Sequence, residues 1–242
     1  MIKTLFLISV LLFSQVLAKE LRLAIGDELP PYIFKNSSRG IEYEIVKEVL
    51  ALKGYKLVPR YVPLARLIRH VQKDNIDGAL TISENFNTEG MYLSSPYITY
   101  HNVVVSLVKN QVEIEDLSDF KMKSILSFQN SKRYLGDKYS YATDTCRKYS
   151  EMNNQENQVA MLLRDRVDAI VIDKNIFLYH YKTSKKIDEH KKTRFHDLFS
   201  PSHYRVLFKD KEIRRDFNQG LKKLIESGRY DHILAKYTQL NN

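Results

Sequence analysis

The sequence predicts a two-lobed α/β protein, and three observations lead to this prediction. Strand and helix patterns alternate between residues 21 and 82, and the alternation restarts near residue 124. A long β-branched and aromatic run, Tyr97–Val108, lies between the two halves. Alternating strands and helices are typical of a parallel sheet, and a run longer than an ordinary strand can pass from one lobe to another. We therefore expect two α/β lobes joined by a hinge.

The first half contains signals for three strands and two helices. Pro30-Pro31 predicts an extended loop after the first strand. Gly54 suits the end of the first helix, and Pro63 suits the start of the second. The expected elements are, in order, strand Leu21–Ile25, helix Ile41–Leu52, strand Lys56–Tyr61, a helix from Pro63 that carries Leu64, Leu67, Ile68 and Val71, and strand Asp77–Ile82.

The second half repeats this pattern and ends in two amphipathic helices. The expected elements are strand Ser124–Ser127, helix Asn157–Leu163, buried strand Val167–Ile172, helix Asn175–Tyr181, strand Tyr204–Phe208 and two helices within Glu212–Leu240, separated at Ser227-Gly228. We divide the chain into a leader at residues 1–18, a first lobe at 19–105, a second lobe at 106–200 and a return to the first lobe at 201–242.

The first residues have the pattern of a secretory signal peptide. Lys3 precedes the apolar run Leu5–Leu17, and Ala18 is a small residue at its end. The run is shorter than the roughly 20 residues of a membrane-spanning helix, although an uncleaved anchor is the alternative. Cleavage after Ala18 predicts a periplasmic protein that begins at Lys19. The single cysteine, Cys146, lies far from the leader, so we expect neither a lipid anchor nor an internal disulfide.

Charge and motifs argue against several other functions. The net charge is +9, but the basic residues are spread along the chain, and the densest stretch, Lys182–Arg194, includes Asp188 and Glu189. A solvated basic face explains this better than a nucleic-acid partner. We find no glycine-rich phosphate loop, zinc-ligand spacing or nucleophile elbow. We therefore expect no metal and no cofactor.

Six segments, in order, resemble the periplasmic solute-binding proteins of the polar amino-acid type, which are bacterial extracellular solute-binding proteins of family 3. The resemblance covers nearly the whole mature chain. The segments are the aromatic loop Leu29–Tyr32, the helix start Gly40–Val46, the cleft strand Asp77–Ile82, the turn Ser94–Tyr97, the second-lobe strand Arg166–Asp173 and the helical end Phe217–Tyr237.

The resemblance implies a type II, Venus-flytrap fold whose two lobes close on a ligand. It implies that Asp173, at the end of a buried strand, binds the α-amino group of an amino acid. The alternative for Asp173 is a helix N-cap, because a helix follows at Lys174-Asn175. Tyr32 follows Pro31, so its ring could stack on a ligand or pack against the first lobe.

Further candidates lie in the other matching segments. Thr81 and Ser83 end the cleft strand, where their hydroxyl and N–H groups could bind a carboxylate or merely mark a strand edge. Glu42 and Tyr97 belong to the matching helix start and turn. Ser131 lies in Gln129–Lys132, where the family has a helix-opening turn that attracts anions. A plain helix cap is the alternative there.

One departure weakens the match. In the family a Thr-x-Glu-Arg motif follows the cleft strand, and its arginine binds the ligand carboxylate. Here the corresponding stretch is Ser83–Phe86, which contains no arginine. Arg66 could take over this role, since some relatives have a Pro-Trp-x-Arg pattern there. Its alternative is an exposed helix arginine.

The sequence thus predicts a monomeric binding protein for a small polar, amino-acid-like solute, which serves uptake through an ABC transporter permease or sensing by a membrane receptor. The alternative is an enzyme on the same scaffold, similar to cyclohexadienyl dehydratase, with Glu42, Glu84 and Asp173 as acids and bases. No paired catalytic motif supports that alternative.

Overall fold

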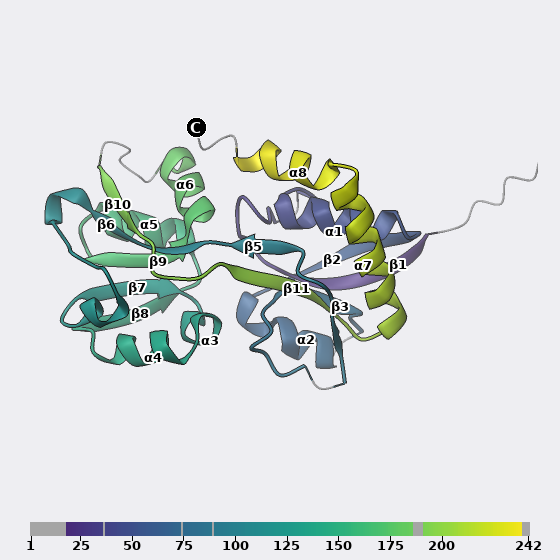
Figure 1. The fold of residues 1–242 in the computed structure, drawn as a ribbon, viewed down its shortest axis with the longest axis horizontal. Coiled ribbons are helices and arrows are strands. Elements are labelled where there is room, and N and C mark those ends of the chain that lie inside the picture. The colour runs from purple at the N-terminus through teal and green to yellow at the C-terminus, as the bar shows by residue number, and fades with distance from the viewer. Residues whose placement is uncertain (1–17, 36, 74, 89, 186–190, 239–242) are drawn as a thin grey trace, which may run out of the picture.

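The protein folds into two lobes that lie side by side (Figure 1). The computed structural model describes residues 18–35, 37–73, 75–88, 90–185 and 191–238. The predicted signal peptide at residues 1–17 therefore lies outside the described residues. Each lobe is built on one β-sheet that carries helices (Figure 1), which confirms the predicted two-lobed α/β fold. None of the helices in the described ranges is long and apolar enough to cross a membrane.

The first lobe contains a six-stranded sheet of order β2-β1-β3-β11-β4, with β5 paired to β11. β1 runs parallel to β2 and β3, and β11 runs antiparallel to β3. The strands are β1 (Lys19–Gly26), β2 (Tyr55–Val62), β3 (Gly78–Ile82), β4 (Tyr92–Leu93), β5 (Ile98–Tyr100) and β11 (Ser202–Phe208). The helices are α1 (Ile41–Ala51), α2 (Leu67–Lys73), which follows a short 3-10 turn, α7 (Lys211–Glu226) and α8 (Arg229–Thr238).

The second lobe contains a five-stranded sheet of order β10-β6-β9-β7-β8. β7 is parallel to β8 and β9, whereas β6 is antiparallel to β9. The strands are β6 (Asn102–Leu107), β7 (Ser124–Phe128), β8 (Lys148–Met152), β9 (Ala169–Asp173) and β10 (Thr193–His196). The helices are α3 (Ser131–Leu135), α4 (Asp137–Asp144), α5 (Gln155–Leu163) and α6 (Lys174–Thr183).

The alternation in β1 shows how the sheet of the first lobe is covered on both faces. Leu23 and Ile25 are fully buried in the main core together with residues of α1. Ala24 points to the opposite face, where it packs with Leu67 and Val71 of α2. Successive side chains of a strand point to opposite faces, so a strand with apolar residues on both faces needs a helix on each side. Burial of each large apolar side chain contributes about 1.5–3 kcal/mol.

The chain crosses between the lobes twice. The predicted long strand is divided at His101 into β5, which pairs with β11, and β6, which pairs with β9 and β10. The predicted lobe boundary at residue 105 falls inside β6. The second crossing lies between β10 and β11, at residues 197–201. Figure 1 shows β5 and β11 side by side between the two lobes.

Candidate functional site

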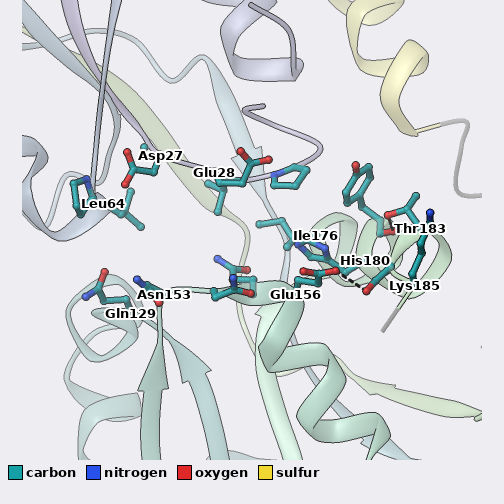
Figure 2. Close-up of a pocket in the computed structure, with 18 residues that line it drawn as sticks. Asp27, Glu28, Leu64, Gln129, Asn153, Glu156, Ile176, His180, Thr183 and Lys185 are labelled. Atoms are coloured by element: carbon teal, nitrogen blue, oxygen red, sulfur yellow. Dashed lines mark hydrogen bonds between the residues drawn. The ribbon is translucent and has the colours of Figure 1, made fainter. Parts of the chain in front are cut away.

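The carboxyl ends of parallel strands from both lobes face one cavity between them. From the first lobe, the segments after β1 and β2 supply Gly26–Pro30 and Pro63-Leu64. From the second lobe, the segments after β7 and β8 supply Gln129 and Asn153–Glu156, and α6 completes the wall. Ligands of open α/β sheets bind outside these strand ends. The cavity has a volume of about 610 Å³, and we call it the outer cavity. In Figure 2, Asp27 and Glu28 lie opposite Asn153 and Glu156 across it.

Asp173 lies at the end of β9 and is buried between the lobes. Its Oδ1 accepts hydrogen bonds from the N–H groups of Asn175 (2.9 Å) and Ile176 (3.1 Å), so it caps α6. Its Oδ2 accepts from the N–H of His101 at 2.8 Å. The hydroxyl of Tyr32, from the first lobe, donates to Oδ1 at 3.1 Å. Burial raises the pKa of Asp173 to about 6 even though these donors lower it. Asp173 therefore caps α6 and also bonds across the cleft to Tyr32.

Tyr32 is held from both sides. Its ring stacks on that of Tyr100, with centroids 3.9 Å apart, and its hydroxyl accepts a hydrogen bond from Asn175 Nδ2 at 3.0 Å. The loop carrying Tyr32 lies directly on the start of α1. A Cβ at Gly40 would come within 2.3 Å of the Tyr32 carbonyl oxygen, and the φ of Gly40 is +119°. Glycine at position 40 thus permits the close approach that positions Tyr32.

Glu42 is a fully buried carboxylate next to Tyr100, the ring on which Tyr32 stacks. It accepts hydrogen bonds from the hydroxyls of Tyr97 and Tyr100 and from Thr81 Oγ1, the last at 2.7 Å. Burial raises the pKa of Glu42, and the three hydroxyl donors oppose that shift. Thr81 has a φ of +60°, which is rare for a β-branched residue. Its bonds to Glu42 and Tyr97 hold it in that conformation.

The space between Asp173 and the Glu42 network is almost filled. Only about 20 Å³ remains, which we call the inner cavity. A space of that size admits about one water molecule, so in this closed state it cannot hold an amino acid. The inner and outer cavities share four lining residues, Leu29, Leu64, Gln155 and Ile176. The inner cavity is lined by Leu29, Leu64, Thr81, Tyr100, Asn102, Phe128, Tyr134, Gln155, Asp173, Ile176 and Tyr204.

Contacts at two further places close the cleft. Phe34 of the first lobe meets Tyr179 of α6 edge-on, with ring centroids 5.6 Å apart. Phe86, after β3, contacts Tyr134 of α3 at 5.0 Å, and the Arg133 guanidinium lies 3.9 Å from the Phe86 centroid. These contacts lie on loops and helices outside Tyr32 and Asp173. The structure is therefore that of a closed flytrap.

The other predicted site residues are placed differently. Ser83 is buried after β3, where its Oγ accepts from Asn85 N at 3.3 Å. Arg66 is exposed and lines neither cavity. Ser131 bonds within the second lobe, to Tyr149 Oη at 2.7 Å and to Glu151 Oε1 at 3.0 Å. The structure thus brings Glu42, Thr81 and Tyr97 together, and the roles of Ser83, Arg66 and Ser131 in ligand binding stay predictions.

Sequence reasoning did not identify the acidic lining of the outer cavity. Asp27 lies 3.6 Å from Lys35 Nζ, and Glu28 Oε2 accepts from Lys35 N at 3.0 Å. Glu156 Oε1 accepts from Ser184 Oγ at 2.6 Å. The position of Asp27 and Glu28 directly after a predicted strand is a signal that could have found them. Glu156 follows β8, which was not predicted, so no comparable signal existed for it.

No group of three or more histidine, cysteine, aspartate or glutamate side chains in the described ranges could hold a metal ion. Two of the carboxylates considered for an enzyme also face different surroundings. Glu42 is buried under hydroxyl groups, whereas the side chain of Glu84 is 72% exposed and lies 3.6 Å from Arg205.

The family model for bacterial extracellular solute-binding proteins, family 3, matches residues 21–240. The chain belongs to this family. This membership confirms the predicted resemblance and favours binding over catalysis. No curated protein sequence matches the chain.

Solved structures share the fold of this solute-binding protein. An ancestral arginine-binding protein bound to arginine is 23% identical, with a TM-score of 0.75, and the match covers 91% of this chain and 99% of that one. A histidine kinase sensor domain with similarity to periplasmic binding proteins is 14% identical, with a TM-score of 0.76 and coverage of 91% and 96%. An amino acid ABC transporter substrate-binding protein from Streptococcus pneumoniae, bound to L-arginine, is 16% identical, with a TM-score of 0.70 and coverage of 92% and 95%.

Proposed function

We propose that this solute-binding protein is exported, captures a small polar, amino-acid-like solute between its lobes, and presents it to a membrane transporter or sensor. The observation that carries the proposal is the hydrogen bond from Tyr32 in the first lobe to Asp173 at the end of β9 in the second. This bond needs a closed cleft. A solute that binds both lobes therefore favours the state in which the bond forms.

The structural neighbours support the class of solute and the two kinds of membrane partner. Two of them are described as bound to arginine, one of these as part of an amino acid ABC transporter, and a third is a sensor domain of a histidine kinase. Their identity to this chain is at most 23%, so the ligand and the partner need their own tests. Either the transporter or the sensor would bind the closed form of the two lobes.

The N-terminal sequence supports export to the periplasm. The basic, apolar and small residues from Lys3 to Ala18 follow the order of a signal peptide. β1 begins at Lys19, the residue after the expected cleavage. Cleavage at this point would leave every strand and helix of the two lobes intact. Mass spectrometry of the exported protein would test the cleavage, with Lys19 as the expected first residue.

A thermal-shift screen against small metabolites tests the proposed function. A solute that binds only the folded protein stabilises it by RT ln(1 + [L]/Kd), about 2.7 kcal/mol at one hundred times Kd. We expect at least one small polar solute to raise the melting temperature, and Asp173→Ala to reduce that rise because it removes the cap and the contact with Tyr32. If no solute of this class stabilises the protein, the proposal fails. Turnover of a stabilising solute would instead indicate an enzyme.

A further inference from the structure

The second-lobe turn that was predicted to attract an anion is already occupied by a carboxylate of the protein itself. Glu151, in β8, accepts hydrogen bonds from Asn130 N at 2.7 Å and Lys132 N at 3.4 Å. It also accepts from Ser131 Oγ at 3.0 Å and Tyr149 Oη at 2.8 Å. The Ser131 and Tyr149 hydroxyls also lie 2.7 Å apart, so their two hydrogens serve at most two of the three contacts among Ser131, Tyr149 and Glu151. Glu151 already takes up the N–H of Asn130 and, at the longer distance, that of Lys132, so the turn keeps little capacity for a ligand carboxylate.

The stretch after β3 does not supply the missing carboxylate partner either. Ser83–Phe86 contains no arginine, and two arginines that lie against it, Arg205 of the first lobe and Arg133 of the second, already have contacts. Arg205 donates to the Ser94 carbonyl at 2.8 Å and lies 3.6 Å from Glu84. Arg133 lies over the Phe86 ring. Neither of these arginines lines the inner or the outer cavity.

Asp173, the predicted ammonium partner, already accepts four hydrogen bonds in the closed state. Tyr32 Oη, Asn175 N and Ile176 N donate to Oδ1, and His101 N donates to Oδ2, so only Oδ2 keeps an acceptor site. The adjoining inner cavity has room for about one water molecule. The protein's own groups thus occupy most of the expected amino-acid site and leave no room in it for an amino acid.

The outer cavity is suited to a cation, in contrast to the anion-binding turn discussed above. Its lining includes three carboxylates, Asp27, Glu28 and Glu156, and one ammonium group, that of Lys185. Gln155 Oε1, which lies where the two cavities meet, is buried and has no hydrogen-bond partner. An acceptor without a partner is costly to bury, so a ligand that donates a hydrogen bond to Gln155 would relieve that cost. This acidic lining contrasts with a chain whose net charge is +9.

We infer that the solute is a small cation, an amine or guanidine without a free carboxylate, and that it binds in the outer cavity against Glu28, Glu156 and Gln155. The inference rests on the proposed function and names its substrate class. The carboxylates of the outer cavity form charge-assisted hydrogen bonds with the cation. Tyr32 and Asp173 stay bonded to each other and hold the lobes closed above it.

Isothermal titration calorimetry with agmatine and L-arginine tests the inference, because the two differ only in the α-carboxylate. We expect agmatine to bind at least about tenfold more tightly, since the carboxylate of arginine meets three acidic side chains and, among the described lining residues, a single ammonium group, that of Lys185. Putrescine and L-ornithine form a second pair with the same expected order. Equal or tighter binding of the amino acid in both pairs overturns the inference but leaves the proposed function standing. Absence of binding by both amines also overturns it.

Charge-removing variants locate the cation. Glu156→Gln and Glu28→Gln keep the size of the side chain and should each weaken agmatine about tenfold, the effect of one charge-assisted hydrogen bond. Glu20→Gln is the matched control, because Glu20 pairs with Lys56 at the other end of β1. Agmatine affinity that is unchanged in both cavity variants, or reduced equally in the control, contradicts the assigned position.

Glu151→Ala should improve binding of a ligand carboxylate, whereas the two cavity variants should weaken binding of a cation. It frees the N–H groups of Asn130 and Lys132, so a ligand carboxylate gains a partner. We expect the preference for agmatine over L-arginine to fall several-fold in this variant, while circular dichroism reports an intact fold. If Glu151→Ala leaves the ratio of the two affinities unchanged, Glu151 does not block a carboxylate site. A variant that fails to fold is replaced by Glu151→Gln, for which the same fall is expected to be smaller.

Discussion

The inner and outer cavities of the cleft differ in volume and in the charge of their lining. At the inner cavity, Asp173 and the neighbouring Glu42 accept hydrogen bonds from tyrosine, threonine and backbone donors, and about 20 Å³ remains. The outer cavity holds about 610 Å³ among acidic and amide side chains. In the proposal above, the inner contacts are the lock that holds the lobes together, and the outer cavity is the recognition site for the solute. The comparison teaches that two neighbouring parts of one cleft can differ in whether they leave room for a solute.

The largest expected effect concerns Glu42. Glu42→Ala leaves the hydroxyls of Tyr97, Tyr100 and Thr81 without their acceptor and opens a cavity, so the free energy of unfolding should fall by about 3 kcal/mol or more. Glu42→Gln, which keeps an acceptor, should lose less. Urea unfolding measures both. A loss below about 1 kcal/mol in Glu42→Ala would show that the inner network does not stabilise the fold.

The second effect concerns the pH dependence of Asp173, whose pKa burial raises to about 6. Because this acid has a higher pKa in the folded state than in the unfolded chain, the folded state binds more protons between about pH 4 and pH 6. The contribution of Asp173 to stability is therefore greatest below that window and is lost as the pH rises through it. A rise of about two units in the pKa of Asp173 corresponds to about 2–3 kcal/mol in the free energy of unfolding.

Asp173→Asn isolates this contribution. The variant keeps a side-chain acceptor for the cap but does not titrate. The difference in unfolding free energy between wild type and variant, measured from pH 4 to pH 7, should change in favour of the variant as the pH rises. A difference that is constant with pH would mean that Asp173 is not buried between the lobes in solution.

Tyr32→Phe should produce a smaller effect, confined to closure. The variant removes the hydrogen bonds to Asp173 and Asn175 but keeps the ring stacked on Tyr100. We expect closure of the ligand-free protein to weaken by about 1–2 kcal/mol, which small-angle X-ray scattering detects as a larger radius of gyration. Tyr92→Phe on the exposed strand β4 is the control. Identical scattering of the Tyr32 variant and wild type would show that the Tyr32 hydroxyl does not hold the lobes closed.

Arg66→Ala should have the smallest effect. Arg66 is exposed and lines neither cavity, so stability should change by less than about 0.5 kcal/mol. The affinities for agmatine and L-arginine should stay within about twofold of wild type, well below the tenfold that 1.4 kcal/mol would give. A selective loss of arginine binding would restore Arg66 as the carboxylate clamp.

Sequence patterns predicted the fold well because the relevant signals are local. Apolar periodicity located β1, α1, β3 and β9, and the length of the run at Tyr97–Val108 predicted a crossing between lobes. β8 was missed because Lys148–Met152 is a polar edge strand without apolar alternation. β10 and the short helix α4 were missed as well, since each is brief and half-exposed. The start of α3 was expected only from the family's helix-opening turn at Gln129–Lys132.

The sequence singled out individual candidate residues but not their partners. Asp173 and Thr81 became candidates because they lie at the ends of predicted strands. The bond between Tyr32 and Asp173 joins residues 141 positions apart. The spacing of apolar residues in the sequence does not indicate which donor will hydrogen-bond to a distant carboxylate. The occupation of the Asn130–Lys132 turn by Glu151 depends on the unpredicted strand β8. The proposed shift of recognition from the inner to the outer cavity rests on these non-local contacts.

A crystal structure of the protein with agmatine would test most directly whether recognition lies in the outer cavity. The predicted result places the guanidinium or ammonium nitrogen about 3 Å from the Glu156 or Glu28 carboxylate, with Tyr32 still bonded to Asp173. An amine bonded to Asp173, with the Tyr32 hydroxyl displaced, would contradict the separation of lock and recognition site.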